Sequence, residues 1–400
     1  METFELARCP PFVALSYTWG NPSLCREISV NGKPLYIREN IYQAMSVLQH
    51  LPAAQVSEDP RRERELIRGH FWVDAVCINQ NDVLERGHQV SLMESIFTGA
   101  ACAIAWLGPE AEKSKVAMDA IRSQFKSYAG RADLGGGPQT RWKYWLLRSA
   151  LHRLSFRPYW GRMWTVQEFI LPKNLLLLCG ENGAWWENFL AAKPAIAEMQ
   201  LLQSGWLRLW DARDRWQRSN AHRDRVVDAV AEEVGDAIVG HMPDSGTMSG
   251  LTAADSLDEL LFVFGYGQCS DPRDRIYALL SLVRHQGSQS PSPIVPDYTI
   301  SAEQLYYRVL AHLRSSPSLA DSRSWTDFRG VLCRALELDK DEEYFRRHDT
   351  LYEVTGEKSR QGVDANLRDD EVFKYFLWLR SHKKTAYSIP IVQRGRSGSL

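Results

Sequence analysis

A carboxylate follows two indoles at regular spacing in the stretch PYWGRMWTVQE. Trp160, Trp164 and Glu168 recur every four residues, so in a helix they would share one face. Indoles packed against a carboxyl group exclude water and raise its pKa, which prepares it for proton transfer or for stabilising a positive charge. In the alternative interpretation the tryptophans are core residues and Glu168 forms an ion pair with Arg162 or Arg157.

A second group of candidate site residues ends the apolar run PFVALSY. Tyr17, Trp19 and Gly20 follow directly on this run. Parallel sheets bind ligands at the carboxyl ends of their strands, where an aromatic side chain can stack on a flat ring. Trp19 could equally anchor the loop that it occupies.

Polar side chains also accompany the apolar run HFWVDAVCI. Asp74 lies inside it, and a buried carboxylate must be paired or hydrogen-bonded, so Asp74 either holds an arginine or tyrosine of the site or fixes a loop. Asn79, Gln80 and Asp82 come where this run meets the next helix and form a polar rim for a ligand, or alternatively serve as turn and capping residues. The presence of Glu85 is explained by helix capping alone. The next residue, Arg86, is explained by a place on a solvated helix face or by an ion pair.

The elements that would position these residues alternate along the first part of the chain. Apolar runs bounded by turn residues predict buried strands over 11–17, 70–78, 101–108 and 174–180. Near-continuous apolar strands joined by helices are typical of a mostly parallel sheet covered on both faces. The fold class expected is therefore α/β.

Local signals add detail to this arrangement. Asn31 and Gly32 separate two alternating runs and predict a β-hairpin. Asn40 is expected to cap one helix, and Asp82 another. Farther on, Asp271 with Asp274 predicts the start of a helix and is assigned no catalytic role.

Composition narrows the class of protein. The 400 residues are 44% hydrophobic and 24% charged with a net charge of −1, which gives no global attraction to nucleic acid. Seven cysteines without a C-x-x-C pair indicate a reducing, cytoplasmic setting without disulfides, and ten dispersed histidines predict no metal site. No apolar run is long enough for a membrane span, and no secretory signal opens the chain.

Three blocks of sequence, in this order, resemble the signature blocks of the fungal heterokaryon incompatibility family, the HET domain. They are ALSYTWG (14–20), FWVDAVCINQNDVLERGHQVSLMESIF (71–97) continuing into AIAWLG (103–108), and RMWTVQE (162–168). The resemblance implies a role in fungal non-self recognition and programmed cell death. Members usually carry more sequence ahead of the first block, so we expect that the chain is truncated or that its gene model is incomplete.

The resemblance also implies a domain organisation. We expect a HET domain over 1–180, a helical extension over 181–315, and an uncertain, partly disordered tail over 316–400. HET domains are similar in layout to TIR domains, which implies a TIR-like (flavodoxin-like), mostly parallel sheet flanked by helices. A hairpin and a C-terminal mostly helical region would accompany it.

Analogy with TIR domains implies a chemistry for Glu168. Some TIR domains use a glutamate of a Trp/Cys-to-Glu helical motif to cleave NAD, and Glu168 occupies that place. Cleavage of the nicotinamide N-glycosidic bond passes through an oxocarbenium-like transition state that a carboxylate stabilises. NAD would be a substrate, with no cofactor or metal required. The residues expected around it are Tyr17, Trp19, Gly20, Asp74, Asn79, Gln80, Asp82 and Trp164.

Two other functions stay open on the sequence alone. The chain could be a non-enzymatic signalling module that acts by self-association and by recruiting an unknown protein partner, or a degenerate inactive paralogue. The enzyme hypothesis requires the Glu168 carboxylate to face a cleft shared with the end of the 11–17 strand. A carboxylate in open solvent, or locked by an arginine with no cavity nearby, would argue against it.

Overall fold

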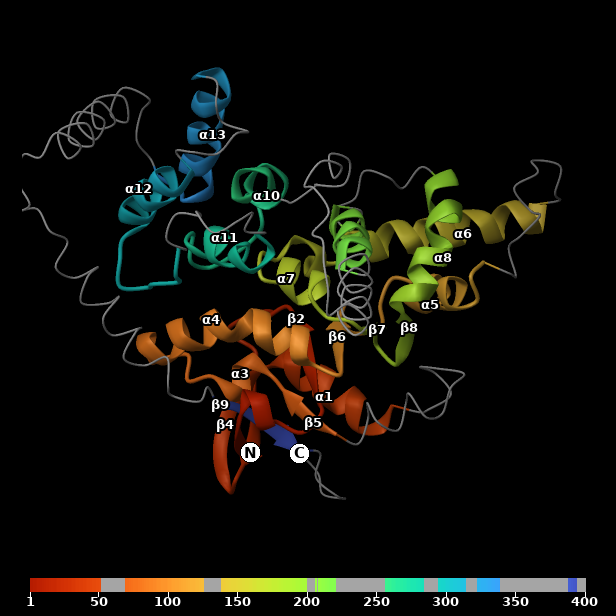
Figure 1. Cartoon of the computed structure of the whole chain (residues 1–400). Coiled ribbons are helices and arrows are strands. Elements are labelled where there is room, and N and C mark those ends of the chain that lie inside the picture. Colours follow the sequence, from red (N-terminus) through yellow and green to blue (C-terminus); the bar gives the residue numbers. More distant parts are fainter. Residues whose placement is uncertain are drawn as a thin grey trace, which may run out of the picture.

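A central seven-stranded sheet organises the computed structural model of the protein (Figure 1). The structure describes residues 1–51, 69–125, 138–199, 206, 208–220, 256–283, 294–313, 322–338 and 388–393. The strands, in their order across the sheet, are β1 (Glu2–Glu5), β9 (Ser388–Gln393), β5 (His70–Trp72), β2 (Phe12–Tyr17), β6 (Cys102–Trp106), β7 (Leu175–Cys179) and β8 (Asn182–Trp185).

The middle of this sheet is parallel and its edges are antiparallel. Strand β2 pairs in parallel with β5 and β6, and β6 pairs in parallel with β7. Antiparallel strands β8 and β9 flank this core, and β1 pairs with β9. The α/β fold class with a mostly parallel, helix-flanked sheet is therefore confirmed. Two of the seven strands, β8 and β9, come from outside residues 1–180.

Alternation along β2 divides the core into two layers. Phe12 and Ala14 belong to one hydrophobic cluster, whereas Val13, Leu15 and Tyr17 belong to a second cluster on the opposite face. Side chains on both faces of β2 are buried away from water, which explains why its sequence is an unbroken apolar run.

Helices cover the two faces unequally. The helices α4 (Val83–Gly99), α5 (Ser114–Arg122), α6 (Pro138–Ser155), α7 (Thr165–Ile170) and α8 (Trp186–Glu198) pack on the face of Phe12 and Ala14. On the other face lie α1 (Glu39–His50) and the hairpin of β3 (Cys25–Val30) and β4 (Lys33–Arg38).

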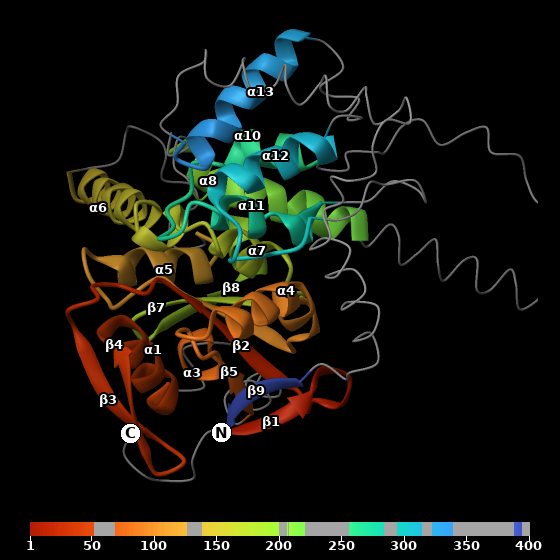
Figure 2. The same ribbon diagram turned by 90° about the vertical axis from the view of Figure 1, so that its left-hand side faces the viewer.

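A further helical layer lies beyond α7 (Figures 1 and 2). It contains a helix over 208–220, α10 (Leu257–Phe264), α11 (Asp274–Tyr277), α12 (Ala302–Leu313) and α13 (Ser322–Ala335). Helices therefore follow the sheet strands in the described residues, and α13 lies within the segment expected to be the tail. The expected loop at 285–293 and most of the 316–400 tail lie outside the described residues. No helix in the described ranges is long and apolar enough to cross a membrane.

Local predictions have mixed outcomes. The hairpin is confirmed, with Asn31 at φ 51° and Gly32 at φ 76°, the backbone that a two-residue type I′ turn requires. The cap by Asp82 is confirmed as well, since its side chain accepts from the N–H groups of Leu84 and Glu85. The cap by Asn40 is wrong: α1 begins one residue earlier, and the Asn40 amide donates to Thr18 O and accepts from the Trp106 indole.

One expected strand boundary is also wrong. The strand predicted over 70–78 stops at Trp72, and Asp74 opens a four-residue helix, α3 (Asp74–Cys77). Helix α11 begins at Asp274, three residues after Asp271, yet the Asp271 carboxylate accepts from the Arg273 backbone N–H, as a capping side chain does. At Asp74, by contrast, the polar side chain has tertiary partners that compete with the regular strand.

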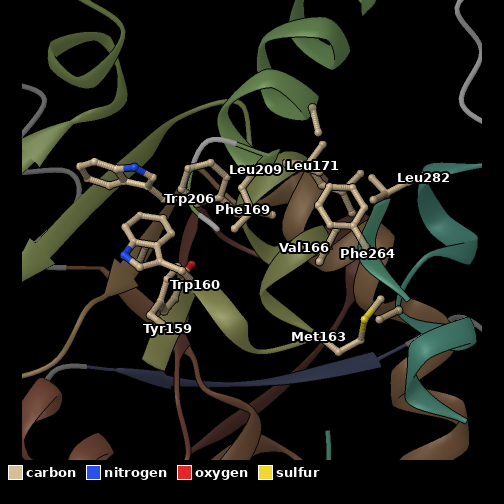
Figure 3. Close-up of a cluster of buried hydrophobic side chains, with 14 of the residues drawn as sticks. Tyr159, Trp160, Met163, Val166, Phe169, Leu171, Trp206, Leu209, Phe264 and Leu282 are labelled. Atoms are coloured by element: carbon tan, nitrogen blue, oxygen red, sulfur yellow. The ribbon is translucent and has the colours of Figure 1, made fainter. Parts of the chain in front are cut away.

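Helix α7 is short and is buried on every side. All six of its residues are buried. Figure 3 shows why: its Val166 and Phe169 lie in one apolar cluster with Trp160 before the helix and with Trp206 and Phe264 from the outer helical layer. A six-residue helix has little stability of its own, so packing between the sheet and the outer layer holds it in place.

One buried arginine fixes the carboxyl end of α7. Arg213, on the 208–220 helix, is 0% exposed and donates to the backbone oxygens of Phe169 (2.6 Å), Ile170 (3.1 Å) and Lys173 (3.3 Å). Carbonyls at a helix end lack partners within the helix, and Arg213 supplies them. Burial lowers its pKa to about 10, an effect that Glu187 partly opposes.

Replacement of Arg213 by Met should therefore destabilise the protein severely. The substitution leaves buried carbonyls without donors, and each such group costs about 1–3 kcal/mol, so we expect the free energy of unfolding to fall by about 3 kcal/mol or more. Urea denaturation measures this. Arg215→Met, at an exposed position two residues later on the same helix, is the matched control and should change stability by less than about 0.5 kcal/mol. Equal stability of the two variants would contradict the capping role.

Candidate functional site

A cavity of about 920 Å³ opens at the carboxyl ends of β2, β5 and β6. Its lining includes Trp19 after β2, Asp74 after β5 and Leu107 after β6. Other lining residues come from much later in the chain than strand β8, among them Gln268, Asp271 and Tyr298. A volume of this size is within the range of small-molecule and nucleotide sites.

Glu168, on α7, lines this cavity although the residue is only 2% exposed. Its Oε2 accepts a hydrogen bond from Ser16 Oγ at 2.6 Å. Ser16 lies on the α7-facing side of β2, in line with Phe12 and Ala14, so strand alternation aims its hydroxyl at the helix. The Tyr159 hydroxyl lies 2.8 Å from Ser16 Oγ and completes a buried chain of polar groups.

Arg162 connects the two carboxylates of the site. Its Nη1 is 3.4 Å from Glu168 Oε2, and its Nη2 is 3.6 Å from Asp74 Oδ2. It also donates to the backbone oxygen of Tyr17, and its guanidinium lies 6.0 Å from the Tyr17 ring centroid. The side chain is only 15% exposed, so this cation is held between its partners with little access to water.

Asp74 is fully engaged by aromatic donors. Tyr17 Oη donates to its Oδ1, and Trp19 Nε1 donates to its Oδ2 at 3.1 Å. The short helix α3 is what places this carboxylate at the end of β5. Asp74 thus contacts a tyrosine, an arginine and the Trp19 loop, and these contacts do not separate the site role from the loop role that the sequence left open.

Electrostatics of the site follow from burial. Desolvation raises the pKa of the Glu168 carboxyl, Asp74 raises it further, and Arg162 and the Ser16 hydrogen bond act in the opposite direction. Desolvation also raises the pKa of the Tyr17 and Tyr159 hydroxyls, with contributions from Asp74 and Glu168 respectively. Both phenols therefore stay protonated and act as donors.

The cavity contains some of the sequence-predicted residues and not others. Its lining includes Trp19, Gly20, Asp74, Gln80, Trp164 and Glu168. Tyr17 is buried beneath it, 1% exposed, and contacts the site through Asp74. Asn79 and Asp82 are exposed, do not line the cavity, and hold the turn before α4.

The expected single helical face of Trp160, Trp164 and Glu168 is wrong. Trp160 lies in a separate 3-10 helix, Pro158–Gly161, and packs edge-to-face on Phe169 and Trp206 in the core (Figure 3). Trp164 is the residue before α7 and lies in the cavity wall, where its side chain hydrogen-bonds Asp274. Ser16 and Arg162, rather than a pair of indoles, surround the Glu168 carboxylate.

Sequence reasoning missed several residues of the cavity. One feature of the sequence could have identified Ser16: it is the only polar residue on the α7-facing side of the apolar strand β2. The sequence indicated Arg162 only as an ion-pair partner of Glu168, in the interpretation that gives this carboxylate a structural role. Asp271, Asp274 and Tyr298 had no signal at all, because only the tertiary fold brings that wall to the strand ends. Within the described ranges, no group of three or more His, Cys, Asp or Glu side chains forms a metal-binding set.

Comparison with known proteins gives two matches. Residues 12–168 match the family model described as "Heterokaryon incompatibility protein (HET)". The chain is 29% identical over 213 residues to "Heterokaryon incompatibility protein 6, OR allele" of Neurospora crassa, an alignment that covers 44% of this chain and 30% of that protein. The chain thus spans less than a third of the relative's length. No solved structure matches significantly.

The raised pKa of Glu168 predicts a pH-dependent contribution to stability. A carboxyl whose pKa is higher in the folded than in the unfolded protein binds more protons when folded, so stability falls as pH rises from the ordinary value of 4.5 through the raised value. The unfolding free energy of the wild type minus that of Glu168→Gln should therefore decrease between pH 4.5 and 8. Chemical denaturation across this range measures it.

The matched control for this titration is Glu181→Gln, at an exposed position in the turn between β7 and β8. It removes an exposed carboxylate that forms no ion pair within the described residues, and so reports what the loss of a surface carboxylate does by itself. A Glu168→Gln difference that stays flat or rises with pH would contradict the assignment of a desolvated carboxyl.

Proposed function

Since residues 12–168 belong to the heterokaryon incompatibility family, we propose that this protein acts in fungal non-self recognition and programmed cell death by hydrolysing NAD or a related nucleotide at its N-glycosidic bond. The observation that carries the enzymatic part is the position of Glu168. Glu168 lines a cavity that it shares with the end of β2, where Trp19 offers an aromatic surface.

The proposed chemistry uses the residues that surround Glu168. As the bond from the ribose C1′ to nicotinamide breaks, positive charge develops on the ribose, and the Glu168 carboxylate stabilises it. Water then adds to C1′, nicotinamide leaves, and one proton is released. Arg162 and the Ser16 hydrogen bond favour the ionised form of the carboxyl and oppose the effect of burial, and they hold the side chain in place.

Aromatic residues supply the ring contacts in this proposal. Trp19 is held by Asp74 and stacked under the Arg38 guanidinium at 4.8 Å, so its indole is fixed at the rim. Trp164 lines the same cavity. A planar nicotinamide or adenine ring fits such a surface, and its stacking would orient the sugar toward Glu168.

A TIR-like arrangement is part of the same proposal. Its support is the parallel core of β5, β2, β6 and β7, with the glutamate on a short helix at the carboxyl ends of the strands. Action in the cytoplasm is proposed with it, supported by cysteines that are all free. Self-association, or recruitment of a protein partner, would supply the trigger.

A non-enzymatic signalling module is the competing proposal, and one observation favours it. Glu168 is 2% exposed and paired with Arg162, which is also how a purely structural carboxylate would be held. In that case the cavity would be incidental to a role in self-association. A degenerate, inactive paralogue predicts the same absence of turnover.

NAD consumption by the purified full chain distinguishes these proposals. We expect release of nicotinamide from NAD, in dilute solution or under crowding that promotes assembly. Glu168→Ala should lower the rate at least about 100-fold, the usual loss when an electrostatic or acid–base group is removed. Glu181→Ala, a carboxylate outside the cavity, is the control and should keep the wild-type rate.

Two results would contradict the proposed role of Glu168 in NAD hydrolysis. No turnover under either condition, by protein that circular dichroism finds folded, would overturn the enzymatic proposal and favour the signalling module. Equal turnover by the wild type and Glu168→Ala would place the chemistry elsewhere.

A further inference from the structure

The cavity has a second wall whose chemistry differs from that of the Glu168 side. Across from the strand ends it is bounded by Asp271, Asp274 and Tyr298 of the outer layer, and by Arg86 in the first turn of α4. A ligand that fills the cavity must contact both walls. The charges and donors of the second wall therefore determine what the rest of that ligand can be.

Four arginines line the cavity, and three of them are already engaged. Arg38 donates to Gly20 O at 3.1 Å, and Arg157 donates to Pro109 O and Ala111 O at 3.0 Å each. Arg162 is held by Glu168 and Asp74. For Arg86 the described residues provide no side-chain hydrogen bond and no ion pair, and its buried Nε lacks a partner among them.

The Arg86 side chain is nevertheless held in place. Its guanidinium carbon lies 4.4 Å from the centroid of the Tyr298 ring. This cation–π contact fixes the head group without using any of its N–H donors. The sequence-based expectation of a solvated or ion-paired Arg86 is therefore wrong, since the side chain is half-buried and stacked.

The two carboxylates of the second wall have other partners. Asp271 accepts from Arg273 Nη2 at 2.6 Å and from Arg273 Nε at 2.8 Å. Asp274 accepts from Tyr298 Oη at 2.6 Å, and burial raises its pKa. Neither carboxylate forms an ion pair with Arg86, although the charge of Arg86 favours the ionised form of both, and Asp271 is paired with Arg273. The donors of Arg86 are thus left for an anion from outside the protein.

We propose that Arg86 binds a phosphate group of a nucleotide ligand, in an anion subsite of the cavity that Glu168 also lines. This rests on the proposed function in one respect, that the ligand is a nucleotide whose sugar lies at Glu168. A guanidinium presents paired N–H donors that match two phosphate oxygens, and a stacked guanidinium is already oriented for such a contact. A diphosphate between two nucleosides would let one ligand contact both walls.

Binding measurements on the full chain test the subsite without requiring catalysis. The probes are ADP-ribose, which has no nicotinamide bond to cleave, adenosine, which lacks phosphate, and inorganic pyrophosphate. Isothermal titration should show that Arg86→Gln weakens ADP-ribose binding roughly 10- to 100-fold, the range for a lost charge-assisted contact. Adenosine binding should change less than about twofold.

Two further variants make the result specific. Arg8→Gln removes one positive charge from a surface side chain that is 84% exposed and should leave all affinities unchanged. Arg86→Lys keeps the charge without the two-pronged geometry and should bind ADP-ribose with intermediate affinity. Wild-type affinity for ADP-ribose, but not for adenosine, should fall as salt rises. That dependence tests the subsite even if Arg86 variants fold poorly.

Several results would overturn the subsite. They are wild-type affinity in a folded Arg86→Gln protein, no salt dependence of ADP-ribose binding, and no ADP-ribose binding by the wild type at millimolar concentration. Pyrophosphate that binds as tightly as ADP-ribose would overturn the assignment to a nucleotide. If NAD is not hydrolysed but ADP-ribose binds through Arg86, the enzymatic proposal fails and the subsite stands.

Discussion

The ion pair of Arg162 with Glu168 and Asp74 is the interaction on which the site depends. One guanidinium is bound to α7 through Glu168, to the end of β5 through Asp74 and to the end of β2 through the Tyr17 carbonyl. Two carboxylates buried this close would repel each other and resist burial without the cation between them. Arg162 therefore joins three segments that are far apart in the sequence into one corner of the cavity.

The backbone around Arg162 extends that corner to the outer helical layer. The segment of residues 161–163 forms backbone hydrogen bonds with Gln268, from Met163 N to Gln268 O at 2.9 Å and from Gln268 N to Gly161 O at 2.7 Å. Arg213 then caps α7 from the same layer. The family match ends at residue 168, yet Arg213, which caps α7, and cavity-lining residues such as Asp271 and Tyr298 lie beyond it. We infer that the matched segment alone would not form the complete site.

The sequence predicted the sheet well because its signals are local. Apolar runs of strand length, the Asn31–Gly32 turn and the Asp82 cap each depend on a few neighbouring residues, and all three are present. The errors occur where tertiary contacts override local preference. Asp74 leaves the strand because Tyr17 and Trp19 hydrogen-bond its carboxylate, and Trp160 leaves the expected helix because it packs against Trp206.

Only part of the candidate site could be predicted from the sequence, because the rest depends on tertiary contacts. Glu168, Trp19 and Asp74 stand at strand or helix ends that the pattern of elements brings together. Nothing in the spacing of Arg86, Asp274 and Tyr298 indicates that they share a cavity with Glu168, because the contacts between them depend on how the outer layer docks on the sheet. Strand β9 lies between β1 and β5 although it is more than 300 residues from β5 in the sequence, so its place in the sheet is unpredictable on the same grounds.

A structure of the Glu168→Gln variant with bound NAD is the most direct test of the account. We predict the nicotinamide-bearing ribose within hydrogen-bond distance of the side chain at position 168, a ring against Trp19 or Trp164, and the diphosphate at Arg86. An empty cavity at saturating NAD, or NAD bound at another surface with Arg162 still bridging position 168 and Asp74, would contradict it and make the ion pair purely structural.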